Sequence, residues 1–199
     1  MEKIILATRN FDKVREIRAI LSSLPFEICS LKDYPGIPEV IEDGATLEEN
    51  ALKKARQVFQ ATSLPTLSDD TGLEVFHLGL RPGVLSARYA GLNVTYEDNC
   101  RKLLRELQSI PVSNRRARFR CVSIFVDGSR EKIAEGICHG KIIEESRGSG
   151  GFGYDPIFVP DGYSQTFAEL SAEVKNRISH RAKAFTRMAQ ILAQIPFHS

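Results

Sequence analysis

Residues 4–24 read IILATRNFDKVREIRAILSSL, and this stretch predicts a buried strand, a tight turn and a helix. An apolar run opens it and ends at Thr8, as expected of a strand covered by the core. Asn10 then offers a side chain that can cap a helix. Apolar residues follow at helical spacing, at Val14, Ile17, Leu21 and Leu24. A strand that turns directly into a helix is typical of α/β folds.

The rest of the sequence continues to alternate strands and helices. Two further helix starts are marked by pairs with capping-box spacing, Thr46 with Glu49 and Thr95 with Asp98. Strands are predicted at 27–31, 66–68, 73–78, 117–126, 132–139 and 157–159, and helices at 46–61, 96–107 (with Tyr96, Cys100, Leu103 and Leu107 on one face) and 179–194. We therefore predict an α/β protein with a mixed twisted sheet, in which residues 1–199 form a single domain with two lobes around a central substrate cleft.

The composition fits a protein with one substantial core, since 42% of the 199 residues are hydrophobic and 26% are charged. No apolar window approaches the length of about 18 residues that a membrane span needs, and no basic-then-apolar leader precedes the first strand. We therefore expect a soluble protein with no membrane partner. The cysteines form no C-x-x-C pair, which argues against a zinc site or a disulfide framework and favours a reducing cytoplasm: Cys29, Cys100, Cys121 and Cys138.

The charge pattern gives little reason to expect nucleic acid as a partner. The net charge is only +2. Arginines do gather at positions 115, 116, 118 and 120, but Arg118 and Arg120 alternate with Phe119 and Cys121, as on the wet side of a half-buried strand. We interpret the arginines as a strand surface and keep a nucleic-acid binder as an alternative.

A glycine-rich segment, RGSGGFGYDPIFVP at residues 147–160, contains the spacing G-x-G-x-x-G. That spacing indicates a dinucleotide site only when a helix opens on its last glycine. Pro156 excludes such a helix, because proline lacks a backbone donor and favours an extended residue before it. We interpret the segment as a glycine turn that leads Phe152, Tyr154 and Asp155 into a strand edge, forming a small pocket with an aromatic wall and a carboxylate.

Two motifs carry groups suited to a phosphate chain and a metal ion. TRNFDK, at 8–13, lies where a strand is predicted to meet a helix, and a helix N-terminus beside Lys13 would attract an anion. SDDTG, at 68–72, places two carboxylates at a predicted strand end, where magnesium or manganese could neutralise them with help from Glu42. A simple helix cap and a surface turn remain the alternatives.

A third motif, KNRISHRAK at 175–183, places cations at the predicted start of the last helix. Cations oppose the helix dipole there, so a phosphate chain or a carbonyl-rich base would explain them. The alternative is a solvated helix surface. Asn50 and Lys53 on the second helix form a weaker motif, since Lys53 and Lys54 are the kind of residues that are usually just solvated.

Five motifs occur in order along the chain: ATRN at 7–10 with Lys13 and Glu16, SDDTGL at 68–73, PGVLSARY at 82–89, GFGYDP at 151–156 and ISHR at 178–181. Together they resemble the noncanonical purine nucleoside triphosphate pyrophosphatases, also called inosine triphosphate pyrophosphatases or dITP/XTP diphosphatases. The resemblance spans Leu6 to Lys183. Thr71, where serine is usual, and Leu85, where an aromatic residue is common, depart from the family pattern, as does Val174 where a polar residue is frequent.

The resemblance implies hydrolysis of ITP, dITP or XTP to the monophosphate and pyrophosphate, with Mg²⁺, by a homodimer that keeps deaminated purines out of DNA and RNA. It makes Asp70 the proton acceptor and a metal ligand together with Glu42, and Thr71 a substrate contact. The other substrate-binding positions that it implies are Thr8, Arg9, Asn10, Phe11, Asp12, Lys13, Phe152, Gly153, Tyr154, Asp155, Lys175, His180 and Arg181.

Specificity for deaminated purines has a simple chemical basis in this interpretation. Inosine and xanthine carry an acceptor oxygen where adenine carries a donor, so donors from His180 and Arg181 would favour them. Phe152 would stack on the ring. Two other functions remain open besides nucleic-acid binding: a related pyrophosphatase for other modified nucleotides, such as altered pyrimidines, and a nucleotide-binding module that does not hydrolyse its ligand.

Overall fold

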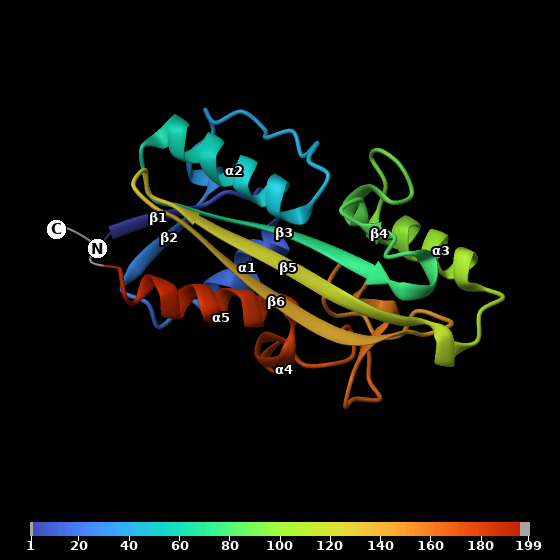
Figure 1. Ribbon diagram of the computed structural model, residues 1–199. Coiled ribbons are helices and arrows are strands. Elements are labelled where there is room, and N and C mark those ends of the chain that lie inside the picture. The colour runs from blue at the N-terminus through green and yellow to red at the C-terminus, as the bar shows by residue number, and fades with distance from the viewer. Residues whose placement is uncertain (1, 196–199) are drawn as a thin grey trace. The chain divides into compact units, whose positions relative to one another are not determined.

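The computed structural model describes residues 2–195, which form helices and strands that alternate along the chain (Figure 1). The strands are β1 Glu2–Leu6, β2 Phe26–Ser30, β3 Thr66–Val75, β4 Pro82–Gly83, β5 Arg116–Val126, β6 Glu131–Ile142 and β7 Phe158–Pro160. The α-helices are α1 Phe11–Ile20, α2 Leu47–Thr62, α3 Tyr96–Leu107, α4 Ala172–Ile178 and α5 His180–Leu192.

The strands form one sheet with the order β2-β1-β3-β5-β6-β7, and β4 pairs with β3. β1 runs parallel to β2, with Ile4 opposite Ile28, and parallel to β3, with Ile5 opposite Thr66. β4 is antiparallel to β3 and β7 is antiparallel to β6. The predicted α/β class and mixed sheet are therefore confirmed.

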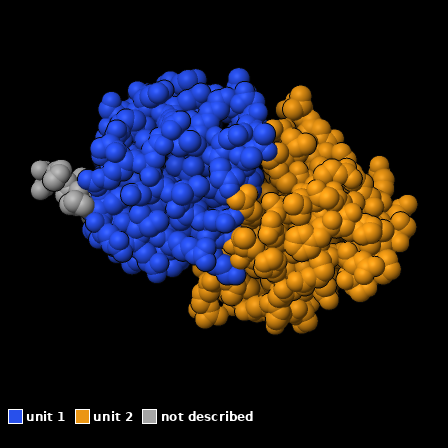
Figure 2. Space-filling model, viewed as in Figure 1, with its two compact units in different colours: residues 1–70, 121–136, 181–199 blue, residues 71–120, 137–180 orange. Residues whose placement is uncertain are grey.

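The chain divides into two compact units, each assembled from segments that are distant in sequence (Figure 2). Unit 1 comprises residues 1–70, 121–136 and 181–199, and unit 2 comprises residues 71–120 and 137–180. Strands β3, β5 and β6 each have residues in both units, and in β3 the boundary falls between Asp70 and Thr71.

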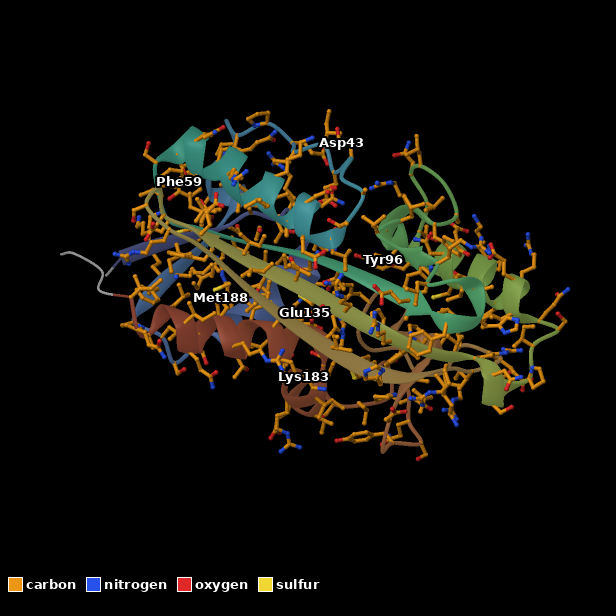
Figure 3. All side chains as sticks on the ribbon, in the orientation of Figure 1. Asp43, Phe59, Tyr96, Glu135, Lys183 and Met188 are labelled. Atoms are coloured by element: carbon orange, nitrogen blue, oxygen red, sulfur yellow. The ribbon has the colours of Figure 1, made fainter. Side chains whose placement is uncertain are left out.

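Unit 1 is built around β1, whose alternate side chains enter two different cores. Ile4 and Leu6 belong to a core with residues of α1 and α5, whereas Ile5 and Ala7 belong to a core that includes Val58 of α2. This is the two-sided burial expected of a parallel strand. Helices α2 and α5 lie on opposite sides of the strands, as the ribbon and the side chains of Phe59 and Met188 show (Figures 1 and 3).

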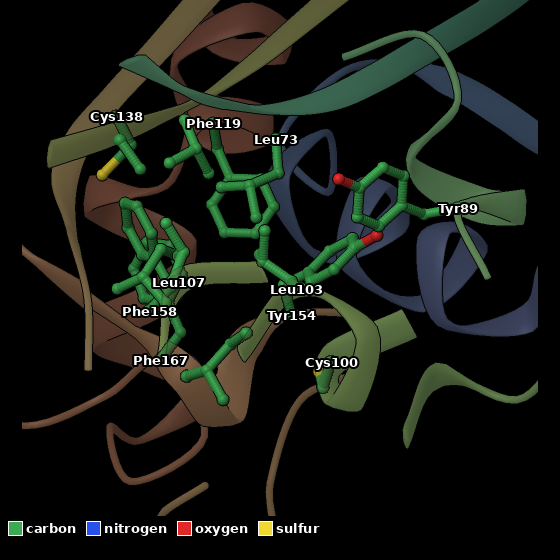
Figure 4. Close-up of a cluster of buried hydrophobic side chains, with 14 residues drawn as sticks. Leu73, Tyr89, Cys100, Leu103, Leu107, Phe119, Cys138, Tyr154, Phe158 and Phe167 are labelled. Carbon is green, nitrogen blue, oxygen red and sulfur yellow. The ribbon is translucent and has the colours of Figure 1, made fainter. Parts of the chain in front are cut away.

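Unit 2 has its own core, packed against the buried face of α3 (Figure 4). Leu103 and Leu107 of α3 are fully buried there. The aromatic part of this core includes Phe119 of β5, whose ring meets that of Phe158 edge-on at 4.7 Å and lies 6.1 Å from that of Phe167. Tyr96, predicted on the same helical face, is the first residue of α3 and is 43% exposed, whereas Cys100, Leu103 and Leu107 of that face are buried.

The predicted helix caps are present, with one adjustment. The Asn10 side chain accepts hydrogen bonds from the backbone N–H groups of Asp12 and Lys13 at 3.0 and 3.2 Å. Thr95 and Asp98 form a complete capping box on α3. On α2 the Thr46 hydroxyl accepts from the Glu49 N–H, but the Glu49 carboxylate accepts from the N–H of Ala45 at 2.7 Å instead of closing the box on Thr46.

Two predicted strands need correction. The strands at 66–68 and 73–78 belong to one continuous strand, β3, which ends at Val75 and is followed by a 3₁₀ turn at Phe76–Leu78, so Asp69 and Asp70 lie inside a strand and not in a turn at its end. The chain stays extended there because buried cations neutralise the two carboxylates, as described below. The predicted last helix is confirmed as α5, and the structure adds a short helix before it, α4, with Ser179 between the two.

The hairpin prediction is confirmed, because β5 and β6 are neighbours in the sheet and flank a turn in which Asp127 accepts hydrogen bonds from the N–H groups of Ser129 and Arg130. The four cysteines are buried, and in the described part of the chain no disulfide joins them. Within residues 2–195, the helices are all too short or too polar to cross a membrane.

Candidate functional site

Acidic and basic side chains gather in unit 1 where β1 has ended and β3 continues. Leu6 is the last residue of β1 and pairs with Leu67, so Asp69 and Asp70 extend beyond the carboxyl end of β1. The segment 8–13 leaves β1 at the same edge and leads into α1. The carboxyl edge of parallel strands is the usual location of ligand sites in α/β proteins.

Asp69 is fully buried and is surrounded by cations. Its Oδ2 lies 3.0 Å from Lys13 Nζ and 3.6 Å from an amino group of Arg181, whose other amino group donates to Glu16 at 2.6 Å. Burial alone would raise the pKa of Asp69, but Lys13, Arg181 and Lys54 outweigh burial and hold that pKa well below its usual range. Asp69 is therefore a permanent anion.

Asp70, the adjacent residue, has different partners. Its carboxylate accepts a hydrogen bond from Asn50 Nδ2 at 3.3 Å and lies 3.4 Å from Lys54 Nζ. Burial raises the pKa of Asp70, and the nearby Lys54 and Lys13 offset this only in part. Two neighbouring carboxylates whose surroundings move their pKa values in opposite directions are suited to different tasks, and the one with the raised pKa is the better candidate for a proton acceptor.

Lys54 joins Asp70 to the third carboxylate of the cluster. Its ammonium donates to Glu42 Oε1 at 2.8 Å as well as contacting Asp70. Burial by itself would lower the pKa of Lys54, but the attraction of Asp70, Glu42 and Asp69 is larger and raises it. Lys54 therefore stays charged, and the expectation that it is simply solvated is wrong, since only 5% of the residue is exposed.

Asn50, which the sequence placed in a weak motif with Lys53, shares a stronger sequence signal with Lys54. Both lie on the stripe of α2 that faces the core, together with Leu47, Ala51, Ala55 and Val58. An amide and an ammonium at core positions need partners, and that need indicates a buried polar cluster. Lys53, on another face of the helix, forms a partly exposed ion pair with Asp43 at 2.6 Å, as a solvated lysine would.

The cluster offers carboxylates for a metal ion but does not enclose one. In the described part of the chain, no three His, Cys, Asp or Glu side chains are grouped so as to hold a metal by themselves. Glu42 and Asp70 nevertheless both contact the same Lys54 ammonium, so their oxygens converge on one cation. This fits Mg²⁺, which commonly takes one or two carboxylates and completes its coordination with water and substrate phosphates.

The Lys13 side chain contacts this cluster. Among the interactions seen in unit 1, it is the only side chain of the predicted phosphate-binding segment 8–13 that does so. Arg9 donates to the Ile37 carbonyl, Asp12 pairs with Arg15, and the Phe11 ring is 62% exposed beneath the Lys32 ammonium. Thr8 accepts from the Asn10 N–H. Because Asn10 caps the N–H groups of Asp12 and Lys13, those donors of the helix N-terminus already have partners.

The glycine segment lies in unit 2 and forms the predicted turn. No α-helix opens on Gly153, and Pro156 lies in a short 3₁₀ turn, Asp155–Ile157, directly before β7. Asp155 is buried, and its Oδ2 accepts from the Phe152 N–H at 2.8 Å and pairs with Lys175. The Lys175 ammonium also lies 4.8 Å from the centre of the Phe152 ring, so the predicted aromatic wall and carboxylate share one lysine.

The remaining predicted residues of unit 2 are mostly buried. The His180 ring stacks on Phe119 at 4.5 Å, and the Tyr154 hydroxyl donates to the Ser86 carbonyl at 2.9 Å. Thr71 is half-buried, whereas the other residues of β3 are buried. His180 and Arg181 are adjacent in sequence but have different surroundings, since the Arg181 guanidinium faces Glu16 and Asp69 in unit 1.

Arg116, Arg118 and Arg120 lie on β5 and form a strand surface as predicted, whereas Arg115 precedes the strand and is buried. Arg116 and Arg118 are partly exposed, whereas Phe119 between Arg118 and Arg120 is buried. Arg116 forms a bidentate ion pair with Asp161, with nitrogen–oxygen distances of 2.6 and 2.9 Å, and Arg118 pairs with Glu74. The alternation predicted from the sequence is confirmed.

The fold and the charged cluster define an α/β protein with buried carboxylates and cations at the carboxyl end of its parallel strands. Comparison with known proteins is consistent with that class. The Ham1 family model matches residues 4–191. A protein of Geobacter sulfurreducens named dITP/XTP pyrophosphatase is 50% identical over 92% of this chain and 93% of its own length.

Solved structures give the same result. A HAM1 protein from Coxiella burnetii aligns with a TM-score of 0.89 at 37% identity, covering 98% of this chain and 100% of the other. The Ham1 protein of Staphylococcus aureus aligns with a TM-score of 0.86 at 36% identity, covering 96% and 98%. The chain belongs to the Ham1 family, and the resemblance found in its sequence is confirmed.

Proposed function

We infer that this chain hydrolyses ITP, dITP and XTP to the nucleoside monophosphate and pyrophosphate, and so keeps deaminated purines out of DNA and RNA. The observation that carries the substrate class is the 50% identity to a protein named dITP/XTP pyrophosphatase over nearly the full length of both chains. The buried cluster around Asp69 and Asp70 supports the chemistry, because it combines lysines for a phosphate chain with a carboxylate that can take a proton.

We propose Asp70 as the proton acceptor. In the reaction, the oxygen of a water molecule bonds to the α-phosphorus as the bond to the bridging oxygen of the β-phosphate breaks, and Asp70 accepts the proton that the water loses. Asn50 and Lys54 hold the Asp70 carboxylate in one orientation. Lys13, on the first turn of α1, supplies positive charge for the phosphate chain.

We propose Mg²⁺ as the cofactor, with Glu42 and Asp70 as its protein ligands. When bound, the ion neutralises charge on the phosphate chain. The two carboxylates that would hold it are the pair that share Lys54. Addition of Mg²⁺ to metal-free protein should raise both the activity and the melting temperature, and an enzyme that is fully active with a chelator present would exclude this proposal.

We propose that Phe152 to Asp155, Lys175 and His180 recognise the nucleobase. What supports this is the aromatic ring of Phe152 beside a buried lysine and carboxylate. A site that donates hydrogen bonds to the base oxygen leaves donors unpaired when adenine enters, which costs about 1–3 kcal/mol per group. Arg181 is not included, since its amino groups face Glu16 and Asp69.

We also propose a homodimer and a cytoplasmic location. The dimer rests on family resemblance alone, and light scattering of the purified protein should give twice the chain mass. The cytoplasmic location is supported by the four free cysteines, which a reducing compartment preserves.

The decisive experiment is a pyrophosphate-release panel with Mg²⁺ over ITP, dITP, XTP, ATP, GTP and altered pyrimidine triphosphates. We expect the deaminated purines to react far faster than ATP and GTP. Equal rates on all substrates would rule out purine selection, and preference for altered pyrimidines would favour the related pyrophosphatase. Tight binding of ITP without pyrophosphate release would indicate a nucleotide-binding module.

A further inference from the structure

A ring of charged side chains connects three elements of unit 1. Lys13 of α1 lies 3.0 Å from Asp69 of β3, Asp69 lies 3.6 Å from Arg181 of α5, and Arg181 donates to Glu16 of α1 at 2.6 Å. Lys13 and Glu16 are three residues apart, so they share one face of α1 and the helix backbone closes the ring.

The four side chains of the ring are buried to different degrees. The Asp69 and Arg181 side chains are 0% and 2% exposed, Glu16 is 9% exposed, and Lys13 is the most exposed member at 15%. The ring contains two cations and two anions, so its charges balance. A flexible lysine side chain is thereby attached at its charged end to a rigid, buried group.

We infer that Asp69 and Glu16 are positioning residues for Lys13: Asp69 holds the Lys13 ammonium directly, and Glu16 holds Arg181, which in turn fixes Asp69. This inference rests on the proposed function, in which Lys13 binds the phosphate chain. It assigns Asp69 a task separate from that of Asp70. Asp69 does not react; it fixes the point at which the Lys13 charge meets the substrate.

The inference predicts that Asp69→Asn weakens binding of the anionic ligand, whereas charge attraction alone predicts stronger binding. Removing the Asp69 charge leaves one negative charge fewer near an anionic ligand, so charge attraction alone would strengthen binding. Loss of the fixed Lys13 ammonium would instead weaken binding. Asp69→Asn keeps the size of the side chain and should therefore raise KM, although it removes a negative charge.

The test is a double-mutant cycle with Asp69→Asn and Lys13→Met, in which methionine keeps the apolar stem of lysine. Two quantities should be measured in every variant, KM for ITP and the dissociation constant of inorganic tripolyphosphate. We expect each single substitution to raise both by about tenfold or more, as loss of a charged hydrogen bond does. The double variant should be no weaker than Lys13→Met alone, because Asp69 acts through Lys13.

Two outcomes would overturn the inference: a lower KM or tighter tripolyphosphate binding in Asp69→Asn, or fully additive effects in the double variant. Should Asp69→Asn fail to fold, the same cycle with Glu16→Met replaces it, with the same expected sign. Glu27→Met is the matched control, since Glu27 is an exposed glutamate of unit 1 that pairs only loosely with Lys3 at 3.9 Å. It should leave both quantities unchanged.

The cycle also separates this inference from the proposed function. Wild-type protein that releases pyrophosphate from ITP but gives additive variants would contradict the positioning role alone. If wild-type protein does not hydrolyse ITP, the proposed function fails, and tripolyphosphate binding then decides whether Asp69 holds Lys13.

Discussion

Lys54 Nζ lies 3.4 Å from Asp70 Oδ1, and both residues are almost fully buried. The same ammonium donates to Glu42 at 2.8 Å, so one lysine balances two of the acidic side chains of unit 1. Without Lys54 two carboxylates would face each other inside the protein. This charge balance therefore predicts how the stability of the protein changes when Lys54 is removed and when a cation is added.

Lys54→Met should lower the free energy of unfolding by about 3–5 kcal/mol, as loss of one partner from a buried ion pair does. Mg²⁺ should restore part of that loss and should raise the melting temperature of Lys54→Met by more than it raises that of the wild type, because the ion can replace the missing charge. Thermal unfolding with and without Mg²⁺ measures both effects.

Lys53→Met is the matched control for this prediction. Lys53 is the neighbouring lysine, and its partner Asp43 is 66% exposed, so its removal should change stability by less than about 1 kcal/mol. Equal losses in the two variants would contradict a special role for the buried lysine.

Asp70→Asn should reduce kcat by about 10² to 10⁴-fold, because it removes the proposed proton acceptor. KM for ITP should change little, since Lys13 and its partners remain. Asp161→Asn, which breaks an exposed ion pair with Arg116, provides a matched control and should keep full activity. Pyrophosphate release from ITP measures all three proteins, and an active Asp70→Asn variant would remove Asp70 from the chemistry.

The sequence predicted the elements of the fold best where local signals were strong. The cap at Asn10, the box at Thr95 and the alternation around Phe119 are all present, because each depends on neighbours within a few residues. The continuous strand through Asp69 and Asp70 could not be predicted in the same way. The Asp69 carboxylate pairs with Lys13 and Arg181, and that of Asp70 with Lys54, and all three cations come from other segments of the chain.

Contacts between residues far apart along the chain also explain why part of the site was not predicted. Glu42, Asp70 and Lys13 were predicted to belong to the site, whereas Asn50 was given only as part of a weak motif and Lys54 was taken as solvated, although both lie on the apolar stripe of α2. Their partners come from a preceding loop and from β3, so only the folded structure brings the groups together.

Asp69 and Asp70 should respond to asparagine substitution with opposite effects on stability. The pKa of Asp69 is lowered in the folded protein, so its charge stabilises the fold above the unfolded pKa, and this contribution is lost as pH falls towards the folded pKa. The pKa of Asp70 is raised by burial, so its charge opposes folding at neutral pH. At pH 7, Asp69→Asn should therefore be less stable than the wild type, and Asp70→Asn at least as stable.

Urea unfolding of metal-free protein between about pH 3 and pH 7 would measure these differences, because the acid end of that range covers the usual pKa of a carboxyl group. The deficit of Asp69→Asn relative to the wild type should shrink as pH falls below the usual pKa of an aspartate, because the unfolded wild-type chain then takes up a proton that the folded protein does not. A deficit that is independent of pH would show that Asp69 stabilises the fold by packing and not by charge.

Gly151→Ala should disrupt the glycine turn of unit 2 by a direct clash. Gly151 has a φ of +68°, and a Cβ there would lie 2.1 Å from Asp155 Oδ2, the oxygen that pairs with Lys175. Gly162→Ala is the matched control, because Gly162 has a similar φ of +84° but no atom within 4 Å of an added Cβ. Both variants should lose about 1–3 kcal/mol from backbone strain. Only Gly151→Ala should also raise KM for ITP, because it displaces the carboxylate that holds Phe152 and Lys175, and equal KM values in the two variants would separate this turn from base recognition.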